Sequence, residues 1–514
     1  MITLSFLFKL ILTVLLVGGL KKLFTHFIRP YFILKKLEKK PGAICFYRPI
    51  FGIMPDLRKN QVKYGDAHYA TKKLVRENPD VKFVAFPLND FICYDLYDPS
   101  LIKEFVEQMT RTTIKDMRII SSRSELERNS LLFSEGEKWK RQKKVISKVF
   151  HFEYMNSYIP TMNHLAKEWI KENCKVSPAT TPIQQSIRSY PGAMIWRIFF
   201  DEENLLTSPE AQRIVNMLAQ HNVDSVTLEY DPLIRLFGPR FFKLGLRAFD
   251  RNFLNRYNQL NEFYREKVNY FKEKVKNNPN KGAETDRPRT LLELLLEDGM
   301  KVNSDEKMTD FELMSQFEAF FSSATETISI VMVMVFYMLA THSDIQRRLR
   351  DEIREYIGNV EVVEYEHIKK MPYLNAFVKE VLRMYGPAAL SLPRQVIKEV
   401  NLEGLKIPKG ESISVHMFGA CYNPKYYEKP EEFNPDRWLE KKDPGVSNAF
   451  TFLPFLIGVR SCIGEIMSYN QIKVMVCHLL RKFEIDIKRP YELRMGFAKF
   501  YETIDPMYPI YKPL

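Results

Sequence analysis

The stretch from Phe452 to Phe483 constrains the fold of this chain more than any other. A loop centred on Cys462 leads into a run of apolar residues at helical spacing, which predicts a buried helix that continues to Phe483. Cys462 would then lie just before a helix N-terminus, where free amide groups and the positive end of the helix dipole favour a thiolate. Gly458 suits a tight turn, and Gly464 allows the backbone to approach a flat, bulky group.

Arg460 adds a fixed cation close to the cysteine. A thiolate, a surface open to a flat group and a partner for an anion together indicate an axial ligand to haem iron, with Arg460 on a haem propionate. Cys477, the nearest other cysteine, would lie roughly 22 Å away on the same helix, too far for a disulfide. A zinc site would need further ligands at short spacing. A plain core cysteine stays open, although it explains neither the glycines nor the arginine.

The loop resembles the haem-binding signature of the cytochrome P450 family, Phe-x-x-Gly-x-Arg-x-Cys-x-Gly. All its fixed positions are present, as Phe455, Gly458, Arg460, Cys462 and Gly464. Further landmarks follow in the expected order, so the resemblance covers the chain from about residue 40 to the C-terminus. It implies a mainly α chain with small β-sheets (α+β), one large haem domain with an N-terminal transmembrane helix, and haem b held by the Cys462 thiolate.

The net charge of +13 is concentrated at the N-terminus. Residues 1–40 carry eight Lys or Arg against Glu38, a net +7, which leaves +6 for the rest of the chain. We therefore expect membrane-flanking charge and no nucleic-acid partner. The six scattered cysteines do not indicate a disulfide framework. No Gly-x-Gly occurs, so the dinucleotide-binding fingerprint is missing and electrons for redox chemistry must come from another protein.

Residues 2–20 are apolar apart from Lys9 and a few small polar residues. As a helix they would span roughly 28 Å, close to a hydrocarbon core of about 30 Å, and the basic residues from Lys21 onward place the following chain in the cytosol. A cleaved signal peptide is the alternative, although Val17-Gly18-Gly19 makes a poor cleavage site. We expect a transmembrane signal-anchor over 1–22, a basic, proline-containing linker over 23–50 and a catalytic domain over 51–514.

Several other elements can be predicted from local patterns. Strands are expected near Val81–Tyr94, mostly helices over residues 155–270, and a surface loop over Lys276–Arg289. Thr309 and Glu312 form a capping box that opens a helix to about Leu339, roughly 45 Å long. Pro372 opens another helix, which Gly386-Pro387 closes.

A helix beginning near Lys138 contains Trp139 and Lys143. In the family that it resembles, a Trp-x-x-x-Arg pair in this helix reaches a haem propionate, so Trp139 and Lys143 are expected there. Lysine supplies a point charge but lacks the planar fork of arginine. The other cations of the helix form either a docking face for an acidic redox partner or a solvated face, with equal weight: Lys138, Lys140, Arg141, Lys144 and Lys148.

Glu326 and Thr327 lie in the middle of the long helix. They match the family's oxygen-activation stretch, Ala-Gly-x-Asp/Glu-Thr, with Ala324 in place of the glycine. Taken alone, Thr327 would be expected to bond back to the carbonyl four residues earlier. Beside an acid, on a helix that crosses the haem in the family, it becomes a catalytic proton-delivery pair with Glu326.

Glu380 and Arg383 share one face of the helix that begins at Pro372. The spacing alone is uninformative, because Glu125 and Arg128 match it equally well. Apolar neighbours crowd Glu380, however, and a buried charge needs partners. The resemblance supplies Arg437, from a Phe-x-Pro-Asp-Arg motif, as the third member of a network for folding and haem retention.

Leu390 to Arg394 resembles a strand that lines the substrate pocket, with Arg394 as a second propionate partner or else as an exposed arginine near a turn. Residues at the family's pocket positions are apolar, which favours a lipophilic substrate, although residues that merely fill a core would give the same set. These are Phe317, Phe320, Phe321, Ala324, Leu390, Leu392, Phe497 and Phe500.

The resemblance implies a monooxygenase, an oxidoreductase that inserts one atom of O2 into a lipophilic substrate such as a fatty acid, sterol or xenobiotic. Electrons would come from NADPH through a separate NADPH-cytochrome reductase, with cytochrome b5 as a further donor, at the endoplasmic reticulum membrane and on its cytosolic side. Two other classes stay open: a haem-thiolate isomerase or dehydratase that needs no reductase, and a membrane-anchored haem or gas sensor.

Overall fold

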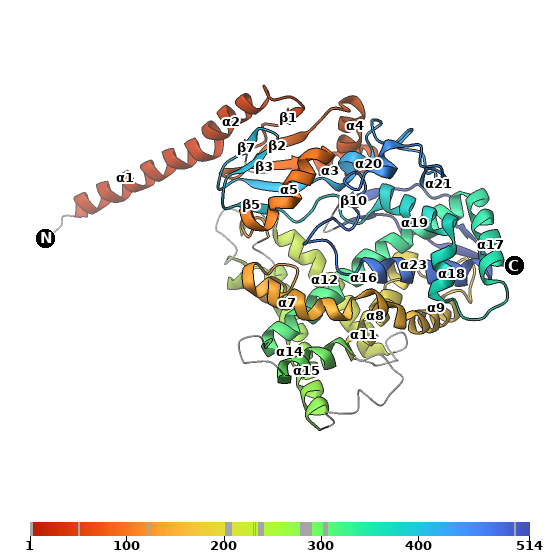
Figure 1. Ribbon diagram of the computed structural model, residues 1–514. Helices are drawn as coiled ribbons and strands as arrows, with labels where there is room; N and C mark the ends of the chain where they lie inside the picture. Colours follow the sequence, from red (N-terminus) through yellow and green to blue (C-terminus); the bar gives the residue numbers. More distant parts are fainter. Residues whose placement is uncertain are drawn as a thin grey trace. The chain divides into compact units, whose positions relative to one another are not determined.

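The computed structural model describes residues 4–49, 52–120, 124–200, 208–229, 231, 233–234, 241–277, 290–301, 307–497 and 500–514. Within them the chain is mainly helical with small sheets, as expected (Figure 1). It divides into two compact units, and each is assembled from separate segments. The first unit comprises residues 1–117, 388–432 and 443–459, and the second comprises residues 118–387, 433–442 and 460–514.

The first unit contains the largest sheet and the N-terminal helices. Its helices are α1 (Leu4–Leu23), a π-helical turn η1 (Phe24–Ile28), α2 (Arg29–Leu37), α3 (Met54–Tyr64), α4 (Tyr69–Glu77), α5 (Pro99–Thr112), α20 (Met417–Cys421) and α22 (Pro444–Ser447). Its strands are β1 (Ala43–Cys45), β2 (Phe83–Leu88), β3 (Phe91–Leu96), β4 (Thr113–Lys115), β5 (Arg394–Val396), β6 (Val400–Leu402), β7 (Leu405–Ile407) and β8 (Ser412–Val415).

Six strands form one mixed sheet in the order β1-β2-β3-β8-β5-β4. The strands predicted near residues 81–94 are confirmed as the antiparallel pair β2 and β3, in which Phe83 lies opposite Leu96. β3 then pairs in parallel with β8, so strands far apart in sequence lie at the centre of the sheet. The side chains of β2 and β3 are buried on both faces, consistent with their nearly continuous apolar sequence.

Residues 24–37, which we expected to be a linker, are helical and attached to the sheet. Leu34 and Leu37 of α2 are buried in the core of the first unit. Arg29 forms an ion pair of 2.5 Å with Glu411, a carboxylate that is 1% exposed and also accepts the Ile92 amide. An apolar stripe and a partly buried ion pair therefore hold α2 against the sheet.

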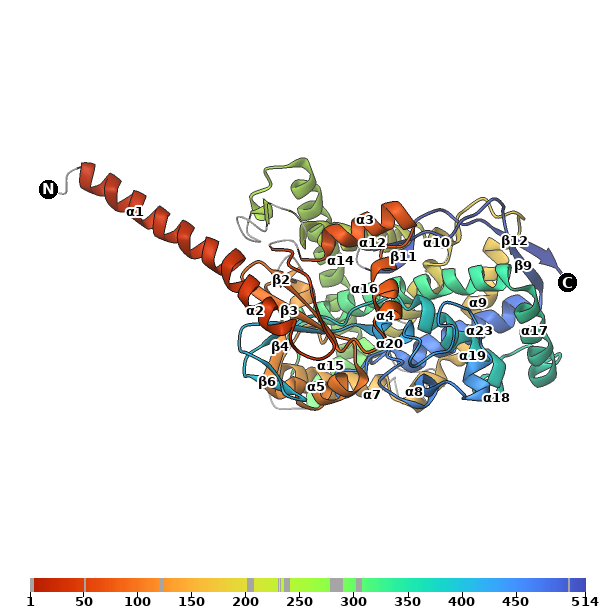
Figure 2. The same ribbon diagram turned by 90° about the horizontal axis from the view of Figure 1, so that it is seen from above.

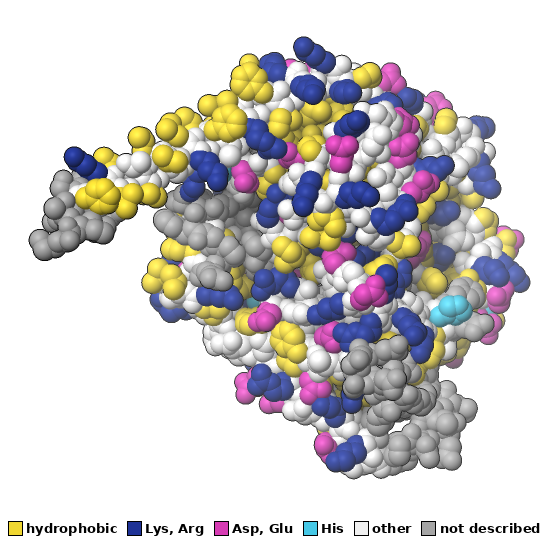
Figure 3. Space-filling model, turned by 60° about the vertical axis from the view of Figure 1, so that its left-hand side comes forward, with side chains coloured by type: hydrophobic (Ala, Val, Ile, Leu, Met, Phe, Trp, Pro, Cys, Tyr) yellow, Lys and Arg dark blue, Asp and Glu magenta, His cyan; other side chains and the backbone are white. Residues whose placement is uncertain are grey.

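The N-terminal helix α1 exposes its apolar side chains. Figure 3 shows the hydrophobic surface that runs along it, and its exposed members include Leu10, Leu12, Val14, Leu15, Leu16, Val17 and Leu20. Lys21 and Lys22 lie in its last turn. Among the described residues, the helix that is long and apolar enough to cross a membrane is Asp310–Thr341, and most of it is buried inside the protein, as in a core helix.

The second unit is helical, with two small antiparallel hairpin-like sheets. Its helices are α6 (Glu125–Asn129), α7 (Gly136–Val149), α8 (Phe152–Ser157), α9 (Ile159–Asn173), α10 (Ile183–Ser186), α11 (Ser189–Phe200), α12 (Pro209–Glu229), a 3-10 turn η2 (Phe242–Leu244), α14 (Ala248–Asn277), α15 (Leu291–Lys301), α16 (Asp310–Thr341), α17 (Ser343–Ile357), α18 (Tyr365–Lys370), α19 (Pro372–Tyr385), α21 (Arg437–Glu440) and α23 (Glu465–Leu480). Its strands are β9 (Phe483–Ile487), β10 (Met495–Phe497), β11 (Tyr501–Thr503) and β12 (Pro509–Pro513).

The long helix α16 is the central element of the second unit. It contacts α11, α14, α19, α23 and the strand β11, and the two ribbon views show it running among these elements (Figures 1 and 2). Its predicted capping box is confirmed, because the Thr309 hydroxyl accepts the Glu312 amide while the Glu312 carboxylate accepts the Thr309 amide. The helix extends to Thr341, slightly beyond the predicted end.

Three boundaries differ from the predictions. The helix after Cys462 ends at Leu480, and Phe483 begins strand β9, because the chain turns there to pair with β12. The strand expected from Leu390 starts only at Arg394, and Leu390 makes a single bridge to His416. Of the loop predicted over 276–289, residues 278–289 lie outside the described part of the chain, and Lys276 belongs to α14.

Asp95 gives the first unit a buried ionisable group. It lies on β3 between Val84 of β2 and Ser414 of β8, and it is 2% exposed. Burial raises the pKa of Asp95 to about 7, although a hydrogen bond from Ser414 opposes the shift. Between the ordinary value near 3.9 and pH 7 the folded state therefore binds more protons than the unfolded state, and raising the pH through this window lowers the free energy of unfolding.

We expect Asp95→Asn to remove the loss of unfolding free energy that accompanies ionisation of Asp95 as the pH rises. The stability of the variant relative to the wild type should rise between about pH 4 and pH 7, by roughly 2–4 kcal/mol, and level off above pH 7. Denaturant unfolding at a series of pH values measures the difference. Asp90→Asn, at an exposed turn, is the control and should show no such trend. A pH-independent difference for Asp95→Asn would show that Asp95 is ionised across this range.

Candidate active site

Cys462 lies two residues before Gly464, the N-cap of α23. All six cysteines are free, so no disulfide involves it. Its side chain is accessible even though protein atoms surround it closely enough to desolvate the thiol. A Cβ placed on Gly464 would meet only the Cys462 Sγ within 4 Å, at 3.9 Å. The backbone at Gly464 therefore has open space on the side of the sulfur.

The Gly464 amide at this helix N-terminus favours the thiolate, as expected, but it does not set the net direction of the pKa shift at Cys462. Burial raises the pKa of the Cys462 thiol, the Gly464 amide N–H lowers it, and nearby Glu465 raises it again, so the net change is upward. Desolvation of a charged sulfur thus outweighs one amide hydrogen bond. A metal cation bonded to the sulfur would reverse this balance, because a coordinating thiol is deprotonated outright.

Three predicted residues meet around one indole ring in the second unit. The Arg460 guanidinium stacks on Trp139, 3.9 Å from the ring centre, and the Lys143 Nζ lies 5.2 Å from the same centre. Arg460 also donates to the Ser134 carbonyl at 3.0 Å and forms an ion pair with Glu135. Burial and the charge of Arg460 lower the pKa of Lys143. The cluster therefore holds two converging cations, which is the chemistry that binds a carboxylate such as a propionate.

The remaining predicted cofactor residues belong to the first unit. Gly458 has φ +84°, and an added Cβ would lie 2.6 Å from Val106, so the turn needs glycine. Phe455 is half-buried. Arg394 is 2% exposed and donates to the Thr113 hydroxyl at 2.8 Å and to the Thr113 carbonyl at 3.1 Å. The alternative of an exposed arginine near a turn is therefore excluded.

Glu326 and Thr327 lie in the middle of α16, which packs against α23. The Thr327 hydroxyl donates to the Ser323 carbonyl at 2.8 Å, the back-bond expected of a mid-helix threonine, and its oxygen keeps the capacity to accept. Glu326 is 8% exposed and forms an ion pair of 3.5 Å with Arg188. A nearly buried carboxylate next to a half-buried hydroxyl can pass a proton and orient a water molecule.

The predicted pocket residues of α16 divide into two faces. Phe320, Ala324 and Thr327 are half-buried and, at spacings of four and three, share one face of the helix. Phe317 and Phe321 are buried in an aromatic cluster with Trp196 and Phe200 of α11 and Tyr264 of α14, some of whose ring centres lie 4.5–5.9 Å apart. Their packing supports the core-filling alternative for these two phenylalanines.

The other predicted pocket residues lie outside α16. Leu390 and Leu392 are half-buried in the first unit, and Phe500 is half-buried beside β11. The backbone of Phe497 pairs with Tyr501, but its side chain lies outside the part of the chain that the structure describes.

A hydrogen-bond network surrounds Glu380 on α19, and Glu380 and Arg383 within it are fully buried. Arg383 donates two bonds of 2.9 Å to its carboxylate, and Arg437 donates one of 3.0 Å. The Trp438 indole and the Asn434 amide complete the set, at 2.9 and 3.0 Å. Burial alone would raise the pKa of Glu380, but the two arginines outweigh it and lower the pKa. Both carboxylate oxygens accept hydrogen bonds from several donors, which is the condition for a stable buried charge.

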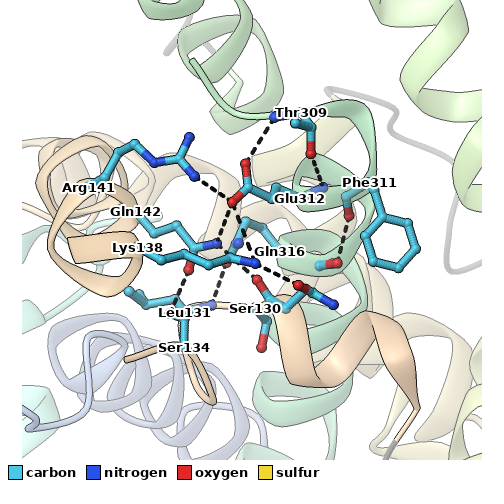
Figure 4. A network of polar contacts seen from close by, with 12 residues as sticks. Ser130, Leu131, Ser134, Lys138, Arg141, Gln142, Thr309, Phe311, Glu312 and Gln316 are labelled. Atoms are coloured by element: carbon cyan, nitrogen blue, oxygen red, sulfur yellow. Dashed lines mark hydrogen bonds and ion pairs between the residues drawn. The ribbon is translucent and has the colours of Figure 1, made fainter. Parts of the chain in front are cut away.

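A second polar network joins α7 to the start of α16 (Figure 4). The Glu312 carboxylate receives Arg141 at 2.6 Å and lies 3.7 Å from the Lys138 Nζ, and Gln142 is also within reach of it. Arg141 and Lys138 thus pair with the buried Glu312 carboxylate. Of the cations predicted to form either a docking face or a solvated face, Lys140 also has a partner, Glu137 of the same helix.

Several functional residues were missed from the sequence. Glu135, Arg188, Trp438 and Thr113 each contact a predicted site residue, but only Trp438, which follows Arg437 directly, lies in a recognisable motif. Among the described residues, no three His, Cys, Asp or Glu side chains are grouped to hold a metal ion. The donors of the second unit instead fit haem: an accessible sulfur at Cys462 and two cations that converge on Trp139.

Comparison with known proteins agrees with this geometry. The family model described as cytochrome P450 matches residues 49–500. The chain is 27% identical to cytochrome P450 3A9 of Rattus norvegicus over 415 residues, 78% of each chain. It is also 27% identical to cytochrome P450 3A5 of Homo sapiens over 69% of each chain, and 25% identical to lithocholate 6-beta-hydroxylase of Mesocricetus auratus over 78% of each. The chain therefore belongs to the cytochrome P450 family and is a monooxygenase, an oxidoreductase.

Proposed function

We propose that this protein inserts one atom of O2 into a C–H or C=C bond of a lipophilic substrate and releases the other atom as water. Electrons come from NADPH through a separate NADPH-cytochrome reductase, with cytochrome b5 as a further donor. One observation carries this proposal. An accessible Cys462 thiol lies just before α23, and α23 packs against α16, the helix that contains Glu326 and Thr327.

Haem b would be held by the Cys462 sulfur, with its propionates on the Trp139–Lys143–Arg460 cluster and on Arg394. Bound there, it supplies the O2 and electron chemistry, and a thiolate ligand favours O–O cleavage. The protein's own residues provide the rest. Thr327 orients water through its accepting oxygen, and Glu326 receives protons and releases them on the same helix. Glu380, Arg383 and Arg437 hold α19 and α21 together and serve folding and haem retention.

The substrate class follows from the half-buried apolar residues. Phe320 and Ala324 share the face of α16 that carries Thr327, so they would form the pocket wall beside the acid–alcohol pair. Phe500, half-buried in the same unit, would add further apolar surface. A fatty acid, sterol or xenobiotic suits such a wall, and one relative is named for its action on lithocholate.

We propose further that α1 anchors the protein in the endoplasmic reticulum membrane as a single span, with the catalytic domain in the cytosol. The exposed apolar side chains of α1 and the basic residues that follow it support this assignment. The chain is then organised as an anchor over 1–22, a connecting segment over 23–50 and a catalytic domain over 51–514. The full-length protein should resist alkaline extraction from membranes, and added protease should digest its catalytic domain in intact microsomes.

Reconstitution tests the catalytic proposal. Haem-loaded protein, reductase and NADPH are combined with candidate lipids chosen by their shift of the haem spin state, and products are analysed after incubation under 18O2. We expect products that carry one labelled oxygen and that require both NADPH and reductase. A product that forms equally without reductase would identify an isomerase or dehydratase instead.

Lys143 is a specific test of the propionate cluster. Lys143→Ala should speed haem transfer to an acceptor apoprotein about tenfold, equivalent to about 1.4 kcal/mol of lost affinity, because one of two converging cations is removed. Lys143→Arg should retain haem as well as the wild type. Lys140→Ala, on the exposed side of the same helix where Lys140 pairs with Glu137, is the matched control. Equal transfer rates for both alanine variants would place the propionate elsewhere.

A further inference from the structure

Arg188, the cation that pairs with Glu326, also acts on a second carboxylate, Glu502 of β11. Arg188 forms the ion pair with Glu326, and the charges of both Arg188 and Glu326 act on Glu502. All three belong to the second unit, where α16 contacts both β11 and α10, the helix just before Arg188. One guanidinium therefore acts on two carboxylates, and one of these, Glu326, is proposed to deliver protons.

Gln184 of α10 holds β11 in place beside this group. Its side-chain amide donates to the Thr503 hydroxyl at 2.9 Å and to the Asp505 carbonyl at 2.7 Å, and its oxygen accepts the Met507 amide at 3.0 Å. Thr503 is the neighbour of Glu502, and Gln184 precedes Arg188 by one helical turn. The same clamp thus fixes the segments that carry Glu502 and Arg188 relative to each other.

Glu502 is more exposed to solvent than Glu326. Glu326 is 8% exposed, whereas Glu502 is half-buried and in contact with solvent. Burial raises the pKa of Glu502, Arg188 lowers it, and the charge of Glu326 raises it further, so the net change is upward. An acid whose pKa is raised toward neutrality holds a proton that it can give away, which is the property of a proton donor.

We propose that Glu502 is the outer member of the proton-delivery path. Its carboxyl group transfers a proton, directly or through one water molecule, to the Glu326 carboxylate, and it is protonated again from solvent. No electrons move in this step, and no bond breaks other than the O–H bond that is remade. Arg188 stays protonated and neutralises whichever carboxylate is ionised. The inference rests on the proposed function, since Glu326 must deliver protons for Glu502 to supply them.

The first experiment reads the carboxyl groups directly and needs no turnover. Infrared difference spectra between wild type and Glu502→Gln, recorded against pH, isolate the titration of Glu502. We expect its midpoint to lie above that of an ordinary glutamate. Glu326→Gln should lower the midpoint, because a neighbouring negative charge is lost, and Arg188→Gln should raise it, because the cation is lost. A midpoint insensitive to both changes would overturn the proposal.

The second experiment measures coupling in the reconstituted enzyme. In Glu502→Gln, the share of NADPH electrons that appears in product should fall at least fivefold and peroxide release should rise, with a larger solvent isotope effect. Turnover driven by added hydrogen peroxide should be preserved. Glu502→Asp should recover part of the coupling. If Glu502 had a purely structural role, Glu502→Gln and Glu502→Asp would show the same pH profile. Glu484→Gln, at an exposed glutamate on β9 that pairs with Lys512, is the matched control.

The outcomes separate the two proposals. If the wild type forms no reductase-dependent product, the proposed function fails whatever the infrared titrations show. If the wild type turns over and Glu502→Gln matches Glu484→Gln in coupling and isotope effect, Glu502 has no part in proton delivery and the proposed function stands. Thermal unfolding and the carbon monoxide spectrum of each variant establish that it is folded and loaded with haem.

Discussion

Replacing Cys462 by alanine should abolish the strongly red-shifted Soret band that the reduced, haem-loaded protein shows with carbon monoxide. The band reports a thiolate bonded to the iron, and Cys462 supplies the accessible sulfur at the start of α23. Reductase-dependent product formation should disappear with it. Cys462→His should still bind haem, but with the band at the position typical of an imidazole ligand.

Cys477 is the matched control for this experiment. It lies on α23, the helix that follows Cys462, and it is fully buried; burial raises the pKa of its thiol to about 12, so it stays protonated and inert. Cys477→Ala should keep the red-shifted band and lose at most about 1–2 kcal/mol of stability through a small cavity. A red-shifted band that survives in Cys462→Ala and vanishes in Cys477→Ala would identify Cys477 as the iron ligand and overturn the assignment to Cys462.

Removing the Glu380 carboxylate should strongly destabilise the fold. Glu380→Ala leaves Arg383 and Arg437 buried without their shared anion, and the loss expected for breaking such a network is about 3–5 kcal/mol. Denaturant unfolding of the haem-loaded protein gives the difference. Haem should also be lost more readily, because α19 and α21 are joined mainly through this carboxylate.

Glu125→Ala provides the control, because Glu125 and Arg128 repeat the same spacing in a different environment. Glu125 is exposed in the first turn of α6, so its removal should change stability by less than about 1 kcal/mol. Glu380→Asp, which retains the charge on a shorter side chain, should fall between the wild type and the alanine variant. Equal effects of the two alanine substitutions would mean that Glu380 is dispensable to the fold.

Much of the fold could be predicted from sequence because its signals are local. The capping box at Thr309, the proline that opens α19 and the left-handed turn at Gly458 each depend on a few adjacent residues. The prediction that the helix after Cys462 continues to Phe483 was wrong, because apolar spacing alone cannot distinguish the end of a helix from the first residue of the strand that follows it.

The candidate site was predictable only where a motif carries it. Cys462 and Arg460 are adjacent in one loop, whereas Arg188 and Glu502 reach Glu326 from segments more than a hundred residues away on either side. The sign of the Cys462 pKa was also missed, because helix position is visible in sequence but desolvation depends on which distant side chains surround the sulfur. Likewise, nothing local showed that Arg141 and Lys138 face Glu312 (Figure 4).

The parallel pairing of β3 with β8 has a consequence for synthesis of the chain. Ile92 and Glu411, which are hydrogen-bonded across this part of the sheet, are separated by 319 residues. At typical translation rates the ribosome needs roughly 15–60 s to make that interval. Throughout it, the newly made β2–β3 hairpin presents an apolar edge with unsatisfied backbone groups, which is the kind of surface that nascent chains aggregate through and chaperones cover. Production of this protein should therefore depend more on protection of that edge than on the speed of helix formation.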